Sequence, residues 1–375
     1  MNHASATTSP VDAEAPLTDW ADVLETLLAG QSLNAPTTTW VMAEMLAGGT
    51  PPAITSAFLV ALRAKGETAE EVGGLVAGML NAGVPLPVDA IVVDTCGTGG
   101  DRAQTVNIST MAAVVAAAAG ARVVKHGNRA ASSQSGSADM LEALGVAVAL
   151  PAAAAAEAGR QLGITFCFAP VFHPAMRHLG PIRKELRIRT VFNVLGPLAN
   201  PARPAAQVLG VPDERIGDLM AEVLGARGTR ALVVHGSDGL DELTVHGPST
   251  VWDIGAAGIE RVTVDPTQLG LAAHPTESLR GGNAERNAAI FRTLLDTPDD
   301  PTVAGVRDAV RLNAAAALVA FSAAGGQLPT ALDVSGSVPQ RLAAALPLVT
   351  AALDEGAARE LLDRWITTSQ SLSGA

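Results

Sequence analysis

The fold of this chain is decided by residues 91–145, which read IVVDTCGTGGDRAQTVNISTMAAVVAAAAGARVVKHGNRAASSQSGSADMLEALG. The apolar run at 91–93 predicts a buried parallel strand that ends at Asp94. A glycine loop, an apolar helix over 111–119 and a second strand over 121–124 follow. A second polar loop then leads into a helix over 138–144. Two strand–loop–helix units in tandem predict a parallel α/β sheet with its ligand at the carboxyl ends of the strands.

Both loops have features of an anion-binding site. The glycines at 97, 99 and 100 let backbone N–H groups approach a ligand, and the helix that follows directs its N-terminus toward the same place. The second loop adds Lys125 and Arg129. The spacing matches neither the dinucleotide fingerprint nor the P-loop, and no acidic pair precedes a T-x-G loop as in the commoner phosphoribosyltransferases. The pattern therefore indicates a phosphate-bearing ligand bound in a different way.

Length and charge narrow the class of protein. A chain of 375 residues exceeds what one hydrophobic core usually organises, so two domains are expected. The net charge of −12 disfavours binding to nucleic acid or to an anionic membrane. The longest nearly apolar run, 111–124, is too short to span a bilayer. Two cysteines without a C-x-x-C motif argue against disulfides and a thiolate zinc site, and favour a cytoplasmic protein.

The rest of the chain predicts the organisation around this segment. Residues 1–17 read as a disordered tail, and 18–88 as a helical domain that also takes in part of 180–210. Residues 89–375 form the α/β domain. Further strands are expected at 146–150, 164–169, 206–211, 231–234 and within 251–264, and further helices at 151–163, 283–295, 303–324 and 339–365. The predicted fold class is α/β, with a small all-helical N-terminal domain and a mainly parallel central sheet.

Two groups of charged residues outside the loops are candidates for chemistry. Asp241 and Glu242 follow the strand at 231–234, where adjacent carboxylates facing a phosphate loop are the hard oxygen ligands that Mg²⁺ prefers. Ser109 adds a hydroxyl from the opposite side. The segment 172–189 carries seven basic residues, and from composition alone it reads as a solvated basic helix face.

Several longer motifs resemble those of the anthranilate phosphoribosyltransferase family. These are GTGGD (97–101), NIST (107–110), KHGNRAASSQSGSADMLEALG (125–145), HPAMRHLGPIRKEL (173–186), RTVFNVLGPLANP (189–201) and VVHGSDGLDELT (233–244). The resemblance implies a nucleoside phosphorylase/phosphoribosyltransferase-like fold and a homodimer paired through the helical domain. It also implies Mg²⁺-dependent transfer of the phosphoribosyl group of phosphoribosyl pyrophosphate to anthranilate, a step of tryptophan biosynthesis.

The resemblance carries over residue by residue. It assigns phosphoribosyl pyrophosphate to Gly97, Gly100, Asp101, Thr105, Asn107, Ile108, Ser109, Thr110, Lys125, His126, Gly127, Asn128, Arg129, Ala130, Ala131, Ser132, Ser133 and Ser137. Anthranilate falls to Gly97, Asn128 and Arg183, and the metal to Ser109, Asp241 and Glu242. No catalytic acid or base is expected, because an arylamine is already neutral at pH 7. Arg102 and Arg187 stand where the family usually has glycine, which leaves the local loop conformations open.

Two other functions remain open at this point. A pyrimidine nucleoside phosphorylase shares the architecture and the glycosyl chemistry, but its second loop has a Lys-x-Ser-Gly-Arg pattern that residues 125–129 do not reproduce. A non-enzymatic nucleic-acid-binding relative is disfavoured by the acidic net charge.

Overall fold

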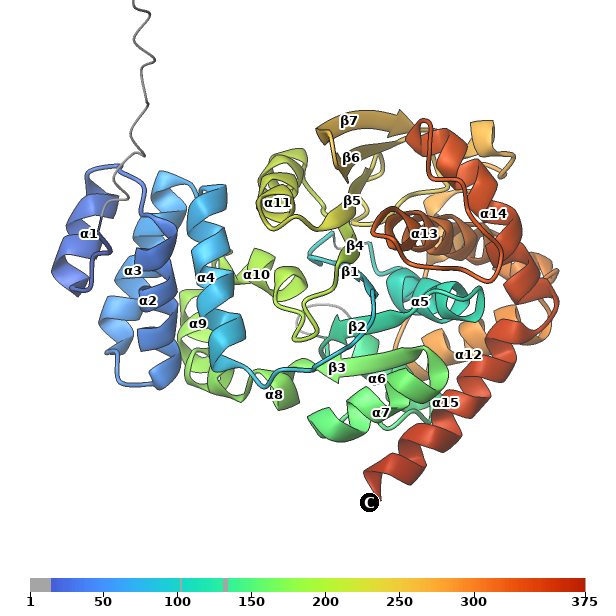
Figure 1. Cartoon of the computed structure of the whole chain (residues 1–375), viewed down its shortest axis with the longest axis horizontal. Helices are drawn as coiled ribbons and strands as arrows, with labels where there is room; N and C mark the ends of the chain where they lie inside the picture. The colour runs from blue at the N-terminus through green and yellow to red at the C-terminus, as the bar shows by residue number, and fades with distance from the viewer. Residues whose placement is uncertain (1–14, 102, 131–133, 375) are drawn as a thin grey trace, which may run out of the picture.

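The structure is a computed structural model that describes residues 15–101, 103–130 and 134–374. Helices from two parts of the chain form a helical layer at one end of the molecule, on the left of Figure 1. The first part supplies α1 (Trp20–Leu28), α2 (Ala35–Ala47), α3 (Pro52–Lys65) and α4 (Ala69–Ala82). The second supplies α8 (Ala169–Phe172), a 3-10 helix (Pro174–His178), α9 (Gly180–Leu186) and α10 (Phe192–Leu198).

One sheet forms the centre of the larger part of the molecule. Its strands are β1 (Val93–Gly97), β2 (Val123–Gly127), β3 (Ile164–Phe168), β4 (Ala206–Gly210), β5 (Arg230–Gly236), β6 (Ser249–Gly255) and β7 (Gly258–Val264). Within the described residues they lie in the order β3-β2-β1-β4-β5-β6-β7. The neighbouring strands from β3 to β5 pair in parallel, whereas β6 is antiparallel to both of its neighbours, β5 and β7. The predicted mainly parallel sheet is therefore confirmed.

Three details of the strand prediction are wrong. The strand predicted to end at Asp94 continues to Gly97, and the second strand extends to Gly127. Their polar residues read as loop in the sequence, yet they are buried and their side chains are bonded inside the protein. The expected strand at 146–150 is also absent from this described segment, which packs on the last helix instead; the Ala147 N–H donates to the Ser369 hydroxyl at 3.0 Å.

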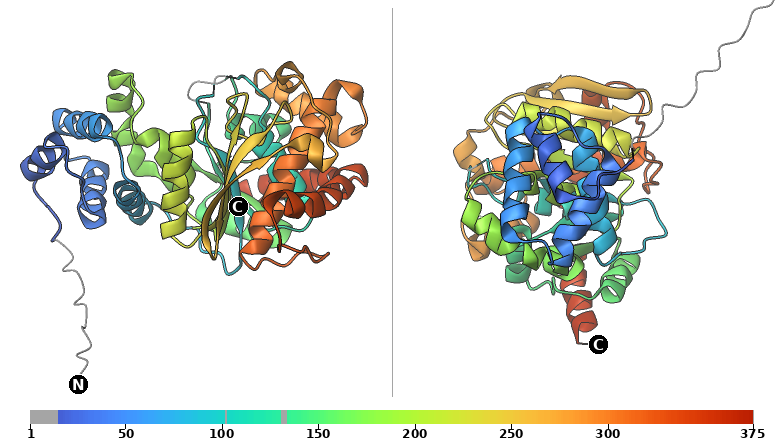
Figure 2. Two further views of the ribbon diagram at one scale, coloured as in Figure 1. Left: turned by 90° about the horizontal axis from the view of Figure 1, so that it is seen from above. Right: turned by 90° about the vertical axis from the view of Figure 1, so that its left-hand side faces the viewer.

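Helices cover both faces of the sheet (Figure 2). Alternate side chains of each strand point to opposite faces. Leu232 and Val234 of β5 therefore pack with α5 and α13, while Ala231 and Val233 pack with α11 and α10 toward the helical layer. The covering helices are α5 (Ile108–Ala118), α6 (Ser137–Leu144), α7 (Ala152–Leu162), α11 (Glu214–Ala226), α12 (Ala284–Asp296), α13 (Ala304–Ala323), α14 (Val338–Asp354) and α15 (Ala357–Ser373).

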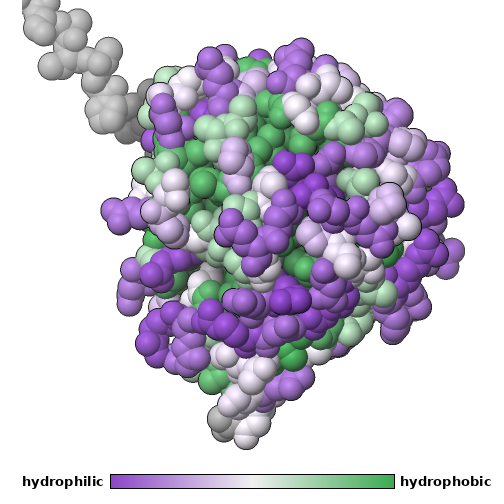
Figure 3. Space-filling model, turned by 90° about the vertical axis from the view of Figure 1, so that its right-hand side faces the viewer, coloured by the Kyte–Doolittle hydropathy of each residue, from purple (hydrophilic) through white to green (hydrophobic). Residues whose placement is uncertain are grey.

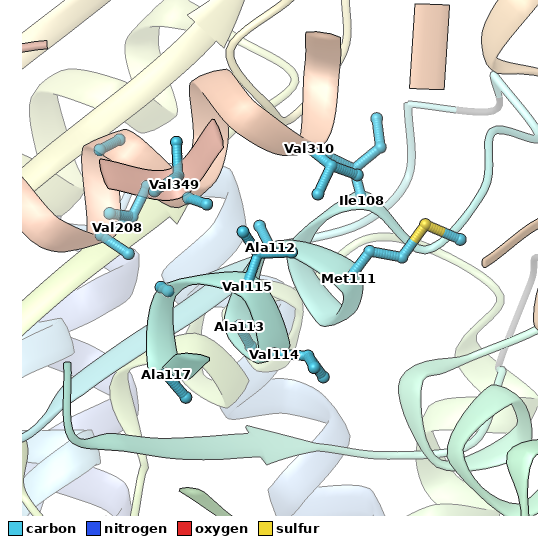
Figure 4. Packing of buried hydrophobic residues seen from close by; sticks show 14 of the residues in the cluster. Ile108, Met111, Ala112, Ala113, Val114, Val115, Ala117, Val208, Val310 and Val349 are labelled. Atoms are coloured by element: carbon cyan, nitrogen blue, oxygen red, sulfur yellow. The ribbon is translucent and has the colours of Figure 1, made fainter. Parts of the chain in front are cut away.

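The central helix α5 lies inside the protein rather than on its surface. Val114 and Val115 are fully buried, and Figure 4 shows side chains of α5 packed beside Val208, Val310 and Val349 from three other elements. The outer face over α12, α14 and α15 mixes hydrophilic and hydrophobic residues (Figure 3). Among the described helices, none is both long and apolar enough to cross a membrane. Burial of α5 on every side fixes the direction of its N-terminus, which points to the carboxyl ends of β1 and β2.

Candidate active site

The first glycine loop leaves β1 and wraps around one carboxylate. Gly99 and Gly100 have φ values of 72° and 90°, a left-handed conformation that glycine adopts without strain. The Gly99 N–H donates to Oδ2 of Asp241 at 2.7 Å. A Cβ at Gly97 would lie 2.1 Å from the same oxygen. Gly97 therefore has to be glycine so that the carboxylate, which is far away in the sequence, can lie against the loop.

Asp241 and Glu242 come together beneath this loop, as the sequence predicted for a strand end. Burial and the nearby Asp101 raise the pKa of Asp241 to about 7. Burial and the Asp241 carboxylate also raise the pKa of Glu242 well above its usual range, while Lys125 and the Ser109 N–H oppose that shift. Two desolvated carboxylates side by side are an unfavourable arrangement for the protein alone, and a bound cation would relieve it.

The Lys125 side chain extends from β2 toward Thr95, Ser109 and Glu242. Its side chain is only 2% exposed, and Nζ donates to the Thr95 carbonyl oxygen and, at 3.3 Å, to the Ser109 hydroxyl. The Thr95 hydroxyl in turn donates to the Ser109 carbonyl oxygen at 2.9 Å. These contacts tie the ends of β1 and β2 to the N-terminus of α5, so the two predicted phosphate loops begin next to each other.

His126 belongs to a buried polar network rather than to the loop surface. Its backbone N–H and the Asn200 side chain both donate to the Asp94 carboxylate, at 3.2 and 2.9 Å. Nδ1 lies 3.1 Å from the Gly196 carbonyl oxygen, and the ring packs edge-on to His173. Burial lowers the pKa of His126 to about 3 and raises that of Asp94 to about 6. A neutral imidazole can therefore position the loop but cannot offer a positive charge to phosphate.

In the second loop, the Arg129 side chain is paired with acidic residues of the adjacent helix α6. The Arg129 guanidinium pairs with Glu142 and Asp139 of α6 and lies 5.4 Å above the Phe168 ring. The Ala130 N–H donates to Asp139 at 2.9 Å. Ser137 donates to the Asn128 carbonyl oxygen at 3.3 Å, and Asn128 Oδ1 accepts from the Arg129 N–H at 2.7 Å. Arg102, Ala131, Ser132 and Ser133 lie outside the described residues.

The segment predicted to receive anthranilate lies on the helical side of the site. Arg183 stacks 5.3 Å above the Phe192 ring, and burial lowers the pKa of its guanidinium. None of its described contacts reaches either glycine loop. Arg187 has a φ of 53°, which is the left-handed conformation that glycine adopts most easily. The arginine therefore keeps the backbone conformation expected of the glycine that it replaces. Arg189, which the sequence analysis missed, donates to the Gly100 carbonyl oxygen at 2.9 Å and bridges the two sides.

A third segment, 279–287, lies beside the first loop, and none of its residues was predicted as part of the site from the sequence. The Val106 N–H donates to the Leu279 carbonyl oxygen and the Gly281 N–H to that of Gln104, both at 2.9 Å. Asn287 donates to the Asn107 side chain at 2.8 Å. A pair of glycines before a helix N-cap was the only sequence signal, and such pairs usually mark ordinary turns.

The oxygen ligands available here fit a magnesium ion. Asp241, Glu242 and the Ser109 hydroxyl offer hard oxygens. Within the described part of the chain, no group of three or more His, Cys, Asp or Glu residues could hold a metal by itself. Mg²⁺ usually binds through one or two carboxylates and completes its shell with water and substrate phosphates.

Comparison with known proteins agrees with this geometry. Residues 21–83 match the family model for the glycosyl transferase family, helical bundle domain, and residues 89–359 match that for the glycosyl transferase family, a/b domain. The second match alone covers more than half of the chain. It includes both glycine loops, Asp241, Glu242 and the 279–287 segment.

Relatives that match nearly the whole chain share one name. An anthranilate phosphoribosyltransferase of Arthrobacter sp. (strain FB24) is 49% identical over 97% of this chain and 99% of its own length. The crystal structure of that enzyme from Thermus thermophilus has a TM-score of 0.83 at 42% identity, covering 93% of this chain and 99% of its own. A Saccharomyces cerevisiae structure in complex with PRPP and Mg has a TM-score of 0.81 at 25% identity, covering 94% and 98%. The chain belongs to the anthranilate phosphoribosyltransferase family.

Proposed function

We propose that this protein transfers the phosphoribosyl group of phosphoribosyl pyrophosphate to the amine of anthranilate, giving N-(5-phosphoribosyl)anthranilate and pyrophosphate. The observation that carries the proposal is the contact between the Asp241 carboxylate and the Gly99 N–H of the glycine loop. It supports the proposal because it brings the proposed metal ligand Asp241 against the backbone of the proposed phosphate loop. The relatives named above supply the identity of the substrates.

Phosphoribosyl pyrophosphate would bind across the two loops. Backbone N–H groups of the first loop and the N-terminus of α5 would hold its phosphates. Lys125 would contribute electrostatically from beneath, since its Nζ already lies against Ser109. Arg129 would contribute through its backbone, because its guanidinium is paired with Glu142. Asp101, Thr105 and Ser137 complete the proposed set by their match to the family.

A magnesium ion would be held by Asp241, Glu242 and Ser109. When bound, it would neutralise negative charge that develops on the pyrophosphate as it leaves. The raised pKa values of the two carboxyls mean that the protein keeps them protonated more readily than isolated carboxyls. Binding of a divalent cation would therefore compete with protons at this position.

The acceptor would enter from the helical side. Arg183 is the proposed partner of the anthranilate carboxylate, and Asn128 and Gly97 face the ring from the loop side. Anthranilate suits this place because the Arg183 guanidinium is held against the Phe192 ring, and its planar fork matches a carboxylate. The amine is neutral at pH 7, so the side chains position it rather than deprotonate it. Catalysis then rests on orientation and on electrostatic stabilisation of the leaving group.

We further propose that the protein works in the cytoplasm as a homodimer. Cys96 and Cys167 are free thiols, which suits a reducing compartment. Leu28 of α1 is 72% exposed on the helical layer, where pairing through that layer would cover it. Light scattering on the purified protein tests the dimer.

An assay with the two substrates and Mg²⁺ tests the function. We expect N-(5-phosphoribosyl)anthranilate and pyrophosphate from phosphoribosyl pyrophosphate and anthranilate, and loss of activity when Mg²⁺ is chelated. No product from anthranilate, together with phosphate-dependent cleavage of pyrimidine nucleosides, would instead support the phosphorylase.

A further inference from the structure

A buried amide outside the proposed substrate contacts links the segments that form the phosphate site. Asn287 lies in the first turn of α12 and is 1% exposed. Its Oδ1 accepts the Gly282 N–H at 2.8 Å, and its Nδ2 donates to Asn107 Oδ1 at 2.8 Å. The position therefore uses an acceptor and a donor on one short side chain, and the asparagine amide supplies both on separate atoms.

The contacts continue from Asn107 into the second loop. Its Oδ1 also accepts from the Ser135 hydroxyl at 3.3 Å, and its Nδ2 donates to the Ser135 carbonyl oxygen at 3.1 Å. Because the Gly282 N–H can only donate, the orientation of the Asn287 amide is fixed, and that of the Asn107 amide follows from it. A single chain of hydrogen bonds thus runs from residue 282 through both asparagines to residue 135.

Asn107 does not cap its own helix. It is the N-cap residue of α5, yet its side chain makes no hydrogen bond to the first turn. Backbone oxygens cap the helix instead: the Thr110 N–H donates to the Asn107 carbonyl oxygen at 3.0 Å and the Ile108 N–H to that of Val106 at 2.8 Å. The Asn107 side chain is thus left to bond to Ser135 and Asn287. Gly281 supports this arrangement, because a Cβ there would lie 2.6 Å from Asn287 Oδ1 and 2.8 Å from the Thr105 carbonyl oxygen.

We propose that Asn287 is a positioning residue for the transfer reaction, which holds Asn107 and, through it, both glycine loops in the geometry that receives the pyrophosphate group of phosphoribosyl pyrophosphate. The inference rests on the proposed function. Asn287 touches no substrate atom; it acts by directing the Asn107 side chain away from the α5 N-terminus and toward Ser135. Loss of its amide removes one donor from Asn107 Oδ1 and the acceptor of the Gly282 N–H, which favours rearrangement of both loops.

The test is steady-state kinetics on the full chain with Asn287→Ala, Asn107→Ala and the double variant. We expect Asn287→Ala to raise the KM for phosphoribosyl pyrophosphate roughly tenfold, as the loss of about one or two hydrogen bonds implies. The KM for anthranilate at saturating phosphoribosyl pyrophosphate stays within twofold. In the Asn107→Ala background, the Asn287 substitution adds no further rise, because the residue through which it acts is gone.

Ser369→Ala is the matched control. Ser369 is a fully buried polar side chain that accepts the Ala147 N–H at 3.0 Å, far along the chain from the loops. Its loss lowers thermal stability without changing either KM. If Asn287→Ala does not fold, Asn287→Ser, which keeps a smaller hydroxyl at that position, is measured in the same way.

Each outcome has one meaning. A wild-type protein that forms no product from the two substrates contradicts the proposed function itself. An active wild type whose Asn287 variant keeps its KM for phosphoribosyl pyrophosphate overturns the positioning role, and so do effects of the two asparagine substitutions that multiply in the double variant. A rise of similar size in both KM values, accompanied by a loss of thermal stability like that of Ser369→Ala, shows a structural role only and overturns the positioning role.

Discussion

Arg183 is the residue on which the choice of acceptor depends. A charge-assisted pair with a buried carboxylate is worth about 2 kcal/mol, so Arg183→Ala should lower kcat/KM for anthranilate on the order of thirtyfold. The KM for phosphoribosyl pyrophosphate should stay the same, because its phosphates are assigned to the loops. Arg183→Lys is the informative companion, since it keeps the charge but loses the planar stacking on Phe192. Equal loss for both substrates would contradict the assignment.

Asp241 carries the metal prediction. Asp241→Asn retains an oxygen for the Gly99 N–H, so the loop should remain in place while a charged ligand is lost. Loss of metal stabilisation of roughly 3 kcal/mol lowers turnover about a hundredfold. Turnover is measured across a Mg²⁺ titration. Asp299→Asn serves as the control, because its carboxylate is 92% exposed; a Mg²⁺ dependence identical in all three proteins would show that Asp241 binds no metal.

Local sequence rules predicted some residues well and failed at others for a physical reason. Asp241 and Glu242 could be proposed from the sequence because two acids after an apolar strand form a recognisable pattern. Arg189 and Asn287 were missed because each is a single polar residue whose partner is far away in the sequence, at Gly100 and Asn107. Only the folded chain brings those pairs together.

At the scale of elements, helix α4 shows how directly a cap can be read. Thr68 and Glu71 form a capping box, and the Glu71 carboxylate also accepts from Lys65 at 2.9 Å and from the Leu33 N–H at 3.0 Å. The box therefore joins three stretches of the helical layer.

Thr68→Ala tests that element. We expect a loss of about 1 kcal/mol in the free energy of unfolding, because the Glu71 N–H loses its side-chain acceptor. Denaturant unfolding gives the value, and kcat/KM should remain at the wild-type level. Thr68→Ser keeps the hydroxyl and should restore most of the stability. An alanine variant as stable as wild type would mean that the box contributes nothing.

The strand ends were harder to predict than the helix caps. Thr95, Lys125 and His126 look like loop residues, and a buried lysine is unusual. They continue β1 and β2 because the backbone still pairs with neighbouring strands and their polar atoms find partners inside. A hydrophobicity pattern locates a strand by its apolar residues, so it ends the strand too early where a site begins.

At the scale of the molecule, the buried network links the helical layer to the sheet. His126 of β2 contacts Gly196 of α10, His173 contacts Ala199, and Asn200 contacts Asp94 of β1. The sequence predicted the order of the elements and the return of part of 180–210 to the helical domain. It could not supply this network, because each contact depends on how the two parts pack.

The network predicts a dependence of global stability on pH. The folded pKa of His126, about 3, is below the unfolded value of about 6.5, so its contribution is present above pH 6.5 and is lost as pH falls toward 3. The stability of wild type relative to His126→Gln should therefore decrease by about 2 kcal/mol between pH 7 and pH 5. Asp94 has the opposite effect, because its raised folded pKa of about 6 stabilises the folded protein at low pH. Asp94 is present in both proteins, so its effect largely cancels when the stability of His126→Gln is subtracted from that of wild type.

Denaturant unfolding at several pH values measures this difference. His246→Gln, which replaces an exposed histidine, provides the comparison. Parallel curves for wild type and His126→Gln would show that the unfolded state gains no extra proton at this residue.

The approach of Asp241 to two strand ends has a consequence for how this protein can diversify. A Cβ at Gly210 would lie 1.4 Å from the Asp241 backbone oxygen, and one at Gly97 would lie 2.1 Å from its carboxylate. Neither position accepts any other amino acid without displacing Asp241. Directed evolution toward new acceptors should therefore leave positions 97 and 210 unchanged. Libraries are best confined to residues 173–192, the segment that contains Arg183. A selection from a library that randomises 97 and 210 together with 173–192 would return glycine at 97 and 210 in every surviving clone.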